Sequence, residues 1–295
     1  MHGNAHRLAL GTAQFGLAYG VTNTSGKVPL AEVKRVLHKA RQAGITTIDT
    51  AAAYGDAETV LGQSQGLAGF DLISKIPGLS GTEITADDAA NVAASLTRSL
   101  ERLGTDRLDG LLLHDPRDLL KPGADRLWHA LEHVKQAGLV KRIGFSAYDA
   151  DEMAELSRRY PADLVQLPMN ALDQRLIRAG TLDVLRERNI AIHVRSAFLQ
   201  GLLLSDAPPP HLAGLAPFLE HWNVFCRDHG LSKQAAALAF LLRDARIERV
   251  VVGVENETQL GALIAAACVV PVDLDWSSLA CNDAALVDPR QWPKP

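Results

Sequence analysis

The repeating unit of this chain is clearest in residues 86–114, which read ADDAANVAASLTRSLERLGTDRLDGLLLH. Apolar residues recur along Ala86–Leu103 with the spacing of an amphipathic helix. Gly104 follows at the position where helices commonly end in a left-handed residue. The Leu-rich run Leu108–His114 has the length and composition of a buried strand. This stretch therefore predicts a helix followed by a strand, the alternation typical of α/β proteins.

The same alternation extends along the whole chain. Eight short β-branched or Leu-rich runs are predicted strands: Leu8–Gly11, Thr46–Asp49, Leu72–Lys75, Leu108–His114, Arg142–Ser146, Leu164–Leu167, Ile190–Arg195 and Val250–Val254. Between them lie the predicted helices Leu30–Ala43, Ala86–Leu103, Ala124–Ala137, Ala150–Arg159, Thr181–Arg188 and Thr258–Ala267. Eight strands alternating with helices is the count of a (β/α)8 TIM barrel, which we expect here. The competing doubly wound sheet usually has fewer strands and, for a dinucleotide, a Gly-rich first turn.

The chain is expected to form one domain. No Pro-, Gly- or Ser-rich linker divides residues 1–295. We place the barrel at about residues 7–270 and a C-terminal extension at 271–295, which fits no barrel unit. The longest irregular stretches, Phe15–Pro29 and Leu202–Pro217, follow the first and seventh predicted strands. Both should open onto the C-terminal rim, where barrel enzymes carry their active sites.

Composition excludes several classes of protein. Hydrophobic residues make up 47% and charged residues 22%, which is ordinary for a globular protein and argues against disorder. The net charge is −4 and no basic run exceeds two residues, so a nucleic-acid partner is not expected. The longest apolar stretch, Ala262–Val272, is too short to span a membrane, and Met1–Gly11 lacks a signal-peptide core. Three widely spaced cysteines suggest reduced thiols, so we expect a cytoplasmic protein.

Two short patterns resemble known motifs without their chemistry. Gly20 and Gly26-Lys27 have the wrong spacing for a phosphate loop, and Val28 replaces the Ser or Thr that binds magnesium. His129, Glu132 and His133 match H-x-x-E-H, but they lie on a predicted outer helix. We interpret that helix face as solvated and expect no metal site. His193, inside the seventh predicted strand, is expected to be a core histidine rather than a ligand.

Polar residues stand at the ends of three consecutive predicted strands. They are Asp49, Lys75 and His114, and Tyr54 follows five residues after Asp49. A buried Lys requires a carboxylate partner, and Asp49 is the expected one. A pair that merely fills the barrel remains an alternative, but it leaves Tyr54 and His114 unexplained.

These four residue types suit proton transfer to a carbonyl oxygen. A phenol has a reference pKa of about 10, and a nearby ammonium lowers it. Lys75 is therefore expected to lower the pKa of Tyr54, with Asp49 holding the ammonium in place. His114 is expected to donate a hydrogen bond to the substrate oxygen as negative charge develops there. No nucleophilic Ser or Cys accompanies them, so hydride from a reduced nicotinamide is the natural attacking group.

These residues in this order resemble the aldo-keto reductase family over nearly the whole chain. The matching segments are Leu10-Gly11-Thr12 with Gly16, Ile48–Ala51 with Tyr54-Gly55, Ser74-Lys75, Leu112–His114, Gly144–Ser146 and Gln166–Asn170. The resemblance implies a catalytic tetrad of Asp49, Tyr54, Lys75 and His114, with Tyr54 the general acid and base. It also implies a nicotinamide dinucleotide bound without a Rossmann domain, with NADP(H) the family default and NAD(H) left open.

The resemblance further implies which residues bind the cofactor. They are Gly11, Thr12, Ser146, Gln166, Asn170, Arg195, Ser196, Phe198, Gln200, Gly201, Gly253, Glu255 and Gln259. Two positions depart from the family pattern. Ala147 stands where Asn usually follows the serine, and Arg195 stands where an aromatic residue usually stacks on the nicotinamide. The guanidinium of Arg195 is planar and able to stack there instead.

The segment after the eighth predicted strand bears on the choice of dinucleotide. Residues 252–259 contain no Lys or Arg but include Glu255 and Glu257. A carboxylate near the ribose accepts a hydrogen bond from a 2′-hydroxyl and repels a 2′-phosphate. We therefore expect weak discrimination between the two dinucleotides, unless a distant Arg195 or Arg249 supplies the missing charge.

The expected function is NAD(P)H-dependent reduction of an aldehyde or ketone to an alcohol, with a small carbonyl compound as the partner. One alternative is a regulatory subunit of the same fold that senses the cofactor. Another is a metal-dependent barrel hydrolase, which lacks its usual H-x-H motif or clustered carboxylates here. The sequence indicates neither the physiological substrate nor the oligomeric state.

Overall fold

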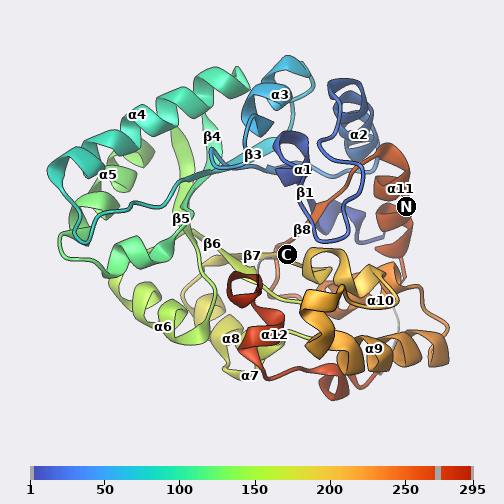
Figure 1. The fold of residues 1–295 in the computed structure, drawn as a ribbon. Coiled ribbons are helices and arrows are strands. Elements are labelled where there is room, and N and C mark those ends of the chain that lie inside the picture. The colour runs from blue at the N-terminus through green and yellow to red at the C-terminus, as the bar shows by residue number, and fades with distance from the viewer. Residues whose placement is uncertain (1–2, 270–273, 294–295) are drawn as a thin grey trace.

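The computed structural model describes residues 3–269 and 274–293, and within them eight parallel strands form a closed barrel (Figure 1). The strands pair in sequence order, and β1 closes the barrel against β8. They are β1 (Leu8–Gly11), β2 (Thr47–Asp49), β3 (Asp71–Ile76), β4 (Leu108–Leu113), β5 (Val140–Ser146), β6 (Leu164–Pro168), β7 (Ala191–Arg195) and β8 (Arg249–Gly253). The predicted (β/α)8 barrel is confirmed, and each predicted strand overlaps an observed one.

Helices surround the barrel (Figure 1). They are α1 (Ala13–Gly16), α2 (Leu30–Gln42), α3 (Ala57–Gln63), α4 (Ala86–Leu103), α5 (Ala124–Gln136), α6 (Ala150–Arg159), α7 (Arg175–Arg178), α8 (Thr181–Glu187), α9 (Ala216–Asp228), α10 (Lys233–Leu242), α11 (Glu257–Ala266) and α12 (Ala284–Val287). The short helices α1 and α12 belong to the loop after β1 and to the C-terminal extension. Helix α4 has the predicted bounds because both its ends are capped. Thr85 and Asp88 form a reciprocal capping box, and Gly104 takes a φ of +66° after the last turn.

The segment between β7 and β8 is more ordered than its sequence suggests. The stretch predicted to be irregular, Leu202–Pro217, holds parts of two 3-10 helices and the start of α9. Helix α10 follows, and its residues 235–242 are all buried. A helix that is apolar on every side has no amphipathic period, which is why the pattern of alternation does not reveal it.

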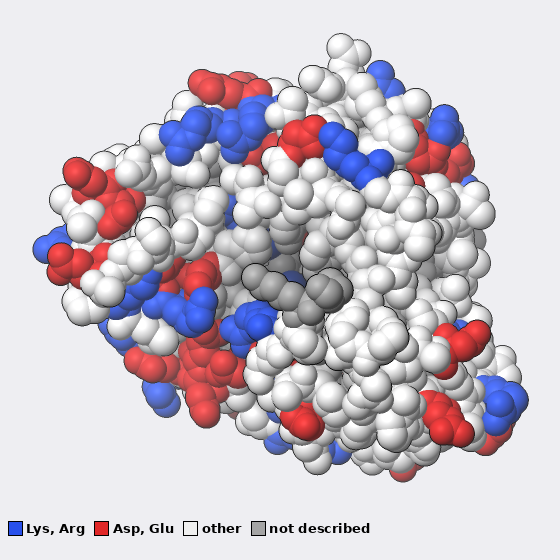
Figure 2. Space-filling model, in the orientation of Figure 1, with Lys and Arg blue, Asp and Glu red and all other residues white. Residues whose placement is uncertain are grey.

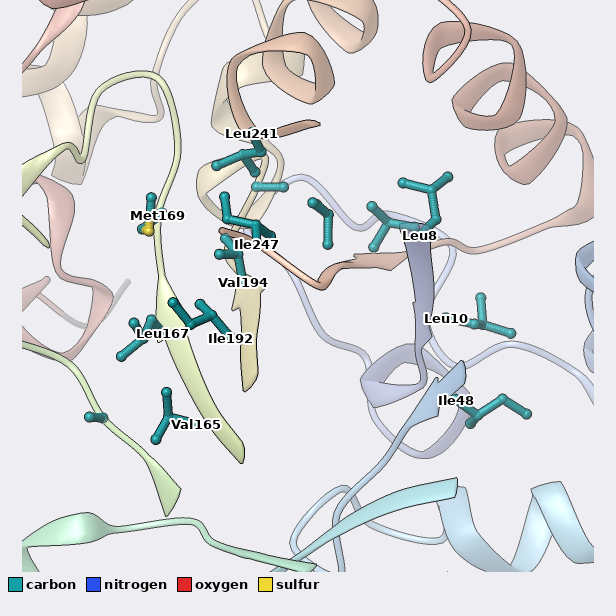
Figure 3. Close-up of a cluster of buried hydrophobic side chains, with 14 of the residues drawn as sticks. Leu8, Leu10, Ile48, Val165, Leu167, Met169, Ile192, Val194, Leu241 and Ile247 are labelled. Carbon is teal, nitrogen blue, oxygen red and sulfur yellow. The ribbon is translucent and has the colours of Figure 1, made fainter. Parts of the chain in front are cut away.

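Two apolar layers hold the barrel together. Side chains on the outer face of the strands, including Leu10, Val165 and Val194, pack against the helices (Figure 3). Inside the barrel, Ile73, Leu112 and Leu164 form a separate small cluster. The interior is therefore filled by side chains, and a ligand must bind at one end of the barrel.

A polar group near the N-terminal end of the barrel surrounds Glu248. Its carboxylate lies 3.0 Å from Arg142 and 3.2 Å from His193 Nε2. His193 is fully buried and its pKa is lowered, chiefly by burial, so it stays uncharged at neutral pH. The same end holds Arg249, whose Nε lies 3.1 Å from Thr47 Oγ1. His193 is thus a core histidine, as predicted, although its Nδ1 has no hydrogen-bond partner among the described residues.

The described part of the C-terminal extension packs onto the barrel. Trp276 is buried against Phe225 and Phe240, at ring-centre distances of 5.2 and 5.7 Å. Backbone atoms of Trp276 and Cys281 bond to the loop that follows β6. This extension therefore lies close to the C-terminal ends of the strands.

Helix α5 carries the H-x-x-E-H pattern on its outer side. His129 and His133 are exposed, whereas Trp128, Leu131 and Val134 are buried, as predicted. No helix of the described ranges is both long and apolar enough to cross a bilayer.

Close strand packing leaves no room for a side chain at Gly144 on β5. A Cβ at this position would lie 1.7 Å from the backbone oxygen of Leu164 on β6. We expect Gly144→Ala to destabilise the fold by about 1–3 kcal/mol or more, because strand backbone must shift. Gly261→Ala on α11 is the matched control, since its Cβ would meet only the flexible end of Lys39. Thermal unfolding of the two variants tests this, and equal melting temperatures would contradict it.

Candidate active site

A cavity of about 590 Å³ opens at the C-terminal ends of the strands. Figure 2 shows this face of the molecule hollowed near its centre, with Lys and Arg side chains at the edge of the hollow. Its walls come from strand ends and from the loops after β1, β2, β5, β7 and β8. The predicted loop Phe15–Pro29 contributes Tyr19 and Thr22. The volume lies in the range typical of small-molecule sites.

A buried ion pair lies at the base of this cavity. Lys75 Nζ lies 2.7 Å from Asp49 Oδ1, and the side chains are 0% and 3% exposed. The ammonium also donates to the backbone oxygen of Thr50 at 2.9 Å. Gln166 Nε2 donates to the second carboxylate oxygen of Asp49 at 2.7 Å. Both oxygens of the carboxylate are therefore satisfied, as a buried charge requires.

Tyr54 and His114 lie directly above this pair. Lys75 Nζ is 5.1 Å from the centre of the Tyr54 ring. The rings of Tyr54 and His114 meet edge to face, with centres 5.7 Å apart. Helix α1 packs closely against the loop that carries Tyr54, because a Cβ on Gly16 would lie 1.8 Å from the Tyr54 backbone oxygen. The structure thus brings together all four predicted catalytic residues.

The charge states of these groups follow from burial and from neighbouring cations. Burial opposes the charge on Lys75, but Asp49 and Tyr54 more than compensate, so the pKa of Lys75 is raised and it stays protonated. Burial, with help from Lys75 and Arg195, lowers the pKa of His114 to about 4. His114 is therefore a neutral imidazole at physiological pH, and a neutral imidazole still has one N–H to donate.

The prediction that the pKa of Tyr54 is lowered is wrong. Lys75 does lower the pKa of the phenol, as predicted, but burial raises it by more, so the pKa lies above its usual value. Tyr54 is consequently protonated at neutral pH. A protonated phenol can donate a proton but cannot accept one.

Most of the predicted cofactor residues line the cavity. Those that do are Gly11, Thr12, Gln166, Arg195, Ser196, Phe198, Gln200, Gly201, Gly253, Glu255 and Gln259. Gln166 Oε1 is buried without a hydrogen-bond partner among the described residues. An unused acceptor at the cavity wall fits the amide group of a nicotinamide.

Two predicted residues lie behind the wall instead. Ser146 is buried, and its hydroxyl accepts a hydrogen bond from Arg195 Nε at 3.2 Å. Asn170 braces the loop after β6: its oxygen accepts from the backbone N–H groups of Leu172 and Asp173, and its amide donates to Ser196 O. Asn170 therefore acts on the cavity only through Ser196.

The loop after β7 has an unusual backbone. Ser196, Leu199 and Gln200 have positive φ values of 62°, 47° and 53°, which cost free energy in residues other than glycine. Gly201 follows at a φ of 96°, and a Cβ there would lie 2.0 Å from Thr22 Oγ1. The loops after β1 and β7 therefore touch beside the cavity, and glycine permits the contact.

One cavity residue that the sequence did not indicate is Tyr148. Its ring lies 4.0 Å from the guanidinium carbon of Arg195. Tyr148 comes two residues after Ser146, so its nearness to the rim was readable, but its contact with β7 was not. Arg195 stacks on this tyrosine of the same chain, a partner that the sequence did not suggest.

The region after β8 differs from expectation in one detail. Glu255 lines the cavity, whereas Glu257 pairs with Lys39 at 3.2 Å and does not. Arg249 bonds to Thr47 at the opposite end of the barrel, and Arg195 lies beside Tyr148. Neither arginine is placed next to Glu255. Within the described ranges, no three His, Cys, Asp or Glu side chains gather as a metal site would need.

The burial of the ion pair makes it a strong determinant of stability. We expect Lys75→Met to destabilise the protein by about 3–5 kcal/mol, because it leaves the Asp49 carboxylate buried without its cation. The double variant Lys75→Met/Asp49→Asn should recover part of the stability that Lys75→Met loses, because it also removes the unpaired carboxylate. Urea unfolding of the wild-type protein and of the two variants tests this. An unchanged unfolding midpoint in Lys75→Met would show that the ion pair is solvated.

Comparisons with known proteins agree with this geometry. Residues 7–280 match the model of the aldo/keto reductase family. The chain is 33% identical over 201 residues to D-threo-aldose 1-dehydrogenase of a Pseudomonas species, covering 64% of this chain and only 60% of that protein's length. It is 27% identical over 291 residues to L-glyceraldehyde 3-phosphate reductase of Escherichia coli K12, covering 83% and 81%.

A solved structure supports the fold. The holo form of an aldo-keto reductase from Bacillus halodurans superimposes with a TM-score of 0.73 at 21% identity, covering 97% of this chain and 95% of that one. The family model covers almost the whole barrel and includes the strand ends that carry the site. The chain therefore belongs to the aldo/keto reductase family of oxidoreductases.

Proposed function

We propose that this protein reduces the carbonyl group of a small aldehyde or ketone to an alcohol, with NAD(P)H as the hydride donor. The observation that carries the proposal is the buried Lys75–Asp49 pair beneath a protonated Tyr54 and a neutral His114, all at one cavity. Such a group suits the delivery of a proton to an oxygen that gains negative charge.

The cavity fits a nicotinamide cofactor at this end. When bound, NAD(P)H would supply a hydride to the carbonyl carbon. Gln166 would hold the nicotinamide amide through its free Oε1, next to the Ser146 hydroxyl. The strained loop 196–201 and residues Gly253 to Gln259 would line the rest of the dinucleotide.

The proton would come from Tyr54. As the carbonyl oxygen becomes negative, the Tyr54 hydroxyl donates its proton to it, and the tyrosinate that remains is stabilised by the adjacent Lys75 ammonium. Asp49 keeps that ammonium charged and in place. The N–H of neutral His114 would donate a hydrogen bond to the same oxygen and orient the substrate.

The substrate is a small carbonyl compound in this proposal, and the protein acts in the cytoplasm. The relatives named above act, by their names, on an aldose and on a phosphorylated glyceraldehyde. A polyhydroxylated aldehyde is therefore a reasonable first substrate to test. A cofactor-sensing subunit without turnover is the alternative, and the complete set of four residues favours an enzyme instead.

Tyr54→Phe tests the role of the phenol. We expect kcat for aldehyde reduction to fall by about 10²–10⁴-fold, because the proton donor is lost while the ring remains. The dissociation constant of NAD(P)H, measured by fluorescence quenching, should stay unchanged. Tyr160→Phe, outside the cavity, is the control and should retain activity. A Tyr54→Phe enzyme with most of its kcat would refute the assignment.

The choice of dinucleotide tests the role of Glu255. We expect kcat/KM with NADH and NADPH to differ by less than about 100-fold for one fixed aldehyde, equivalent to about 2.7 kcal/mol. A carboxylate at the cavity wall repels a 2′-phosphate, so Glu255→Gln should shift the ratio toward NADPH. Glu187→Gln on the exposed side of α8 should not. A wild-type preference for NADPH above about 100-fold would reveal a phosphate clamp.

A further inference from the structure

Arg195 brings a positive charge into the cavity without an acidic partner. It lines the cavity and is partly buried. Two other cations at this end of the barrel form ion pairs: Lys75 pairs with Asp49, and Arg290 pairs with Asp288 at 2.6 Å. Within residues 3–269 and 274–293, no carboxylate lies within 4.0 Å of Arg195. Among the described residues, the guanidinium of Arg195 therefore has no carboxylate beside it.

The guanidinium of Arg195 is held in a fixed position. Its Nε donates to Ser146 Oγ and its Nη2 donates to the backbone oxygen of Ala147, both at 3.2 Å. Its plane lies over the ring of Tyr148, 4.0 Å from the ring centre. A guanidinium has five N–H groups, so three remain without a bond to the described residues. Both acceptors are neutral, so these two hydrogen bonds leave the positive charge of the guanidinium without a counter-charge from the described residues.

Tyr148 is itself clamped from its other side. The guanidinium carbon of Arg290 lies 3.6 Å from the centre of the Tyr148 ring. Because the guanidinium of Arg195 is also only 4.0 Å from this centre, the two groups must lie on opposite faces of the ring. Asp288, 3% exposed, holds Arg290 through both carboxylate oxygens. The Tyr148 backbone N–H donates to Glu152 at 2.9 Å. The extension thus fixes the tyrosine on which Arg195 rests.

The positive charge of Arg195 interacts electrostatically with His114 and Tyr54. It is one of the cations that lower the pKa of His114, and it also opposes the rise in the pKa of Tyr54. Arg195 is therefore close enough to these side chains to interact electrostatically with a molecule bound between them. A planar guanidinium with free N–H groups matches the oxygens of a carboxylate or a phosphate.

We propose that the substrate is a carbonyl compound carrying a carboxylate or phosphate group, which Arg195 binds while the carbonyl lies at Tyr54 and His114. This inference rests on the carbonyl reduction proposed above and assigns the substrate class. Arg195 is the specificity residue, and Tyr148 and Arg290 are positioning residues that hold it.

Paired aldehydes, of which one carries an anionic group and the other does not, provide the test. One pair is succinic semialdehyde and its methyl ester, and the other is glyceraldehyde 3-phosphate and glyceraldehyde. We expect the wild-type protein to favour the anionic member of at least one pair in kcat/KM by about 10- to 100-fold, as for a charged hydrogen bond. The pair that responds identifies carboxylate or phosphate. Arg195→Met should bring that ratio close to one, whatever its effect on the absolute rates.

The matched control is Arg117→Met. Arg117 lies just beyond β4 and pairs with Asp115, but it does not line the cavity, so this variant should keep the wild-type ratio. The dissociation constant of NAD(P)H is measured for each variant as well. A wild-type ratio near one for both pairs overturns the proposal. A kcat/KM ratio that stays unchanged in Arg195→Met also overturns it. If that variant in addition binds NAD(P)H more weakly, Arg195 is assigned to the cofactor instead.

A binding experiment separates failure of this inference from failure of the proposed function. If none of the four aldehydes is reduced, carbonyl reduction itself is refuted for them. Titration calorimetry with succinate and with neutral succinamide then tests the anion site alone. Tighter binding of succinate that disappears in Arg195→Met supports the site. Equal binding of the two compounds, or succinate binding that is unchanged in the variant, refutes a carboxylate site, and inorganic phosphate that binds the wild-type protein and Arg195→Met equally refutes a phosphate site.

Discussion

A full positive charge buried inside the barrel is the constraint on which the site depends. Lys75 has no exposed side-chain surface, so its ammonium is stable only with a carboxylate in contact. Asp49 provides it from the neighbouring strand, and the parallel register places Asp49 beside Gly11, which has no side chain. Gln166 then satisfies the remaining carboxylate oxygen from across the barrel. Because these groups satisfy one another, the base of the cavity is rigid, and the groups above it can be positioned accurately.

The same burial determines which proton chemistry is possible. Removing water from around Tyr54 raises its pKa more than Lys75 lowers it, so the phenol keeps its proton. Removing water from His114 lowers its pKa to about 4, so the imidazole stays neutral. Both effects come from desolvation, which disfavours whichever form carries the charge. Two proton donors beside the fixed ammonium of Lys75 favour the stabilisation of a developing oxyanion over the abstraction of a proton.

The sequence predicts the barrel and the meeting of Asp49, Lys75 and His114 at one rim for one reason. Both depend on strands, and strand ends are marked locally by short apolar runs that stop at a polar residue, such as Asp49. The features it misses depend on contacts between distant segments. Helix α10 is buried on all sides and shows no period, and the stacking of Arg195 and Arg290 on Tyr148 joins three parts of the chain far apart in sequence. The sequence predicts the wrong direction for the pKa shift of Tyr54, because the cost of burying a charge depends on packing, which residue types alone do not reveal.

The position of Arg195 shows how a barrel of fixed chemistry acquires selectivity. Arg195 lies at the cavity end of the barrel because it is the last residue of β7, where its backbone pairs with Pro168 on β6. An arginine there introduces charge where an aromatic ring would not, and its long side chain needs support to stay in one conformation. That support comes from Tyr148 after β5 and, through it, from Arg290 in the C-terminal extension. Residues outside the barrel can therefore alter which substrate is accepted without disturbing the Lys75–Asp49 pair. The strands fix the reaction, while loops and the extension select the molecule that undergoes it.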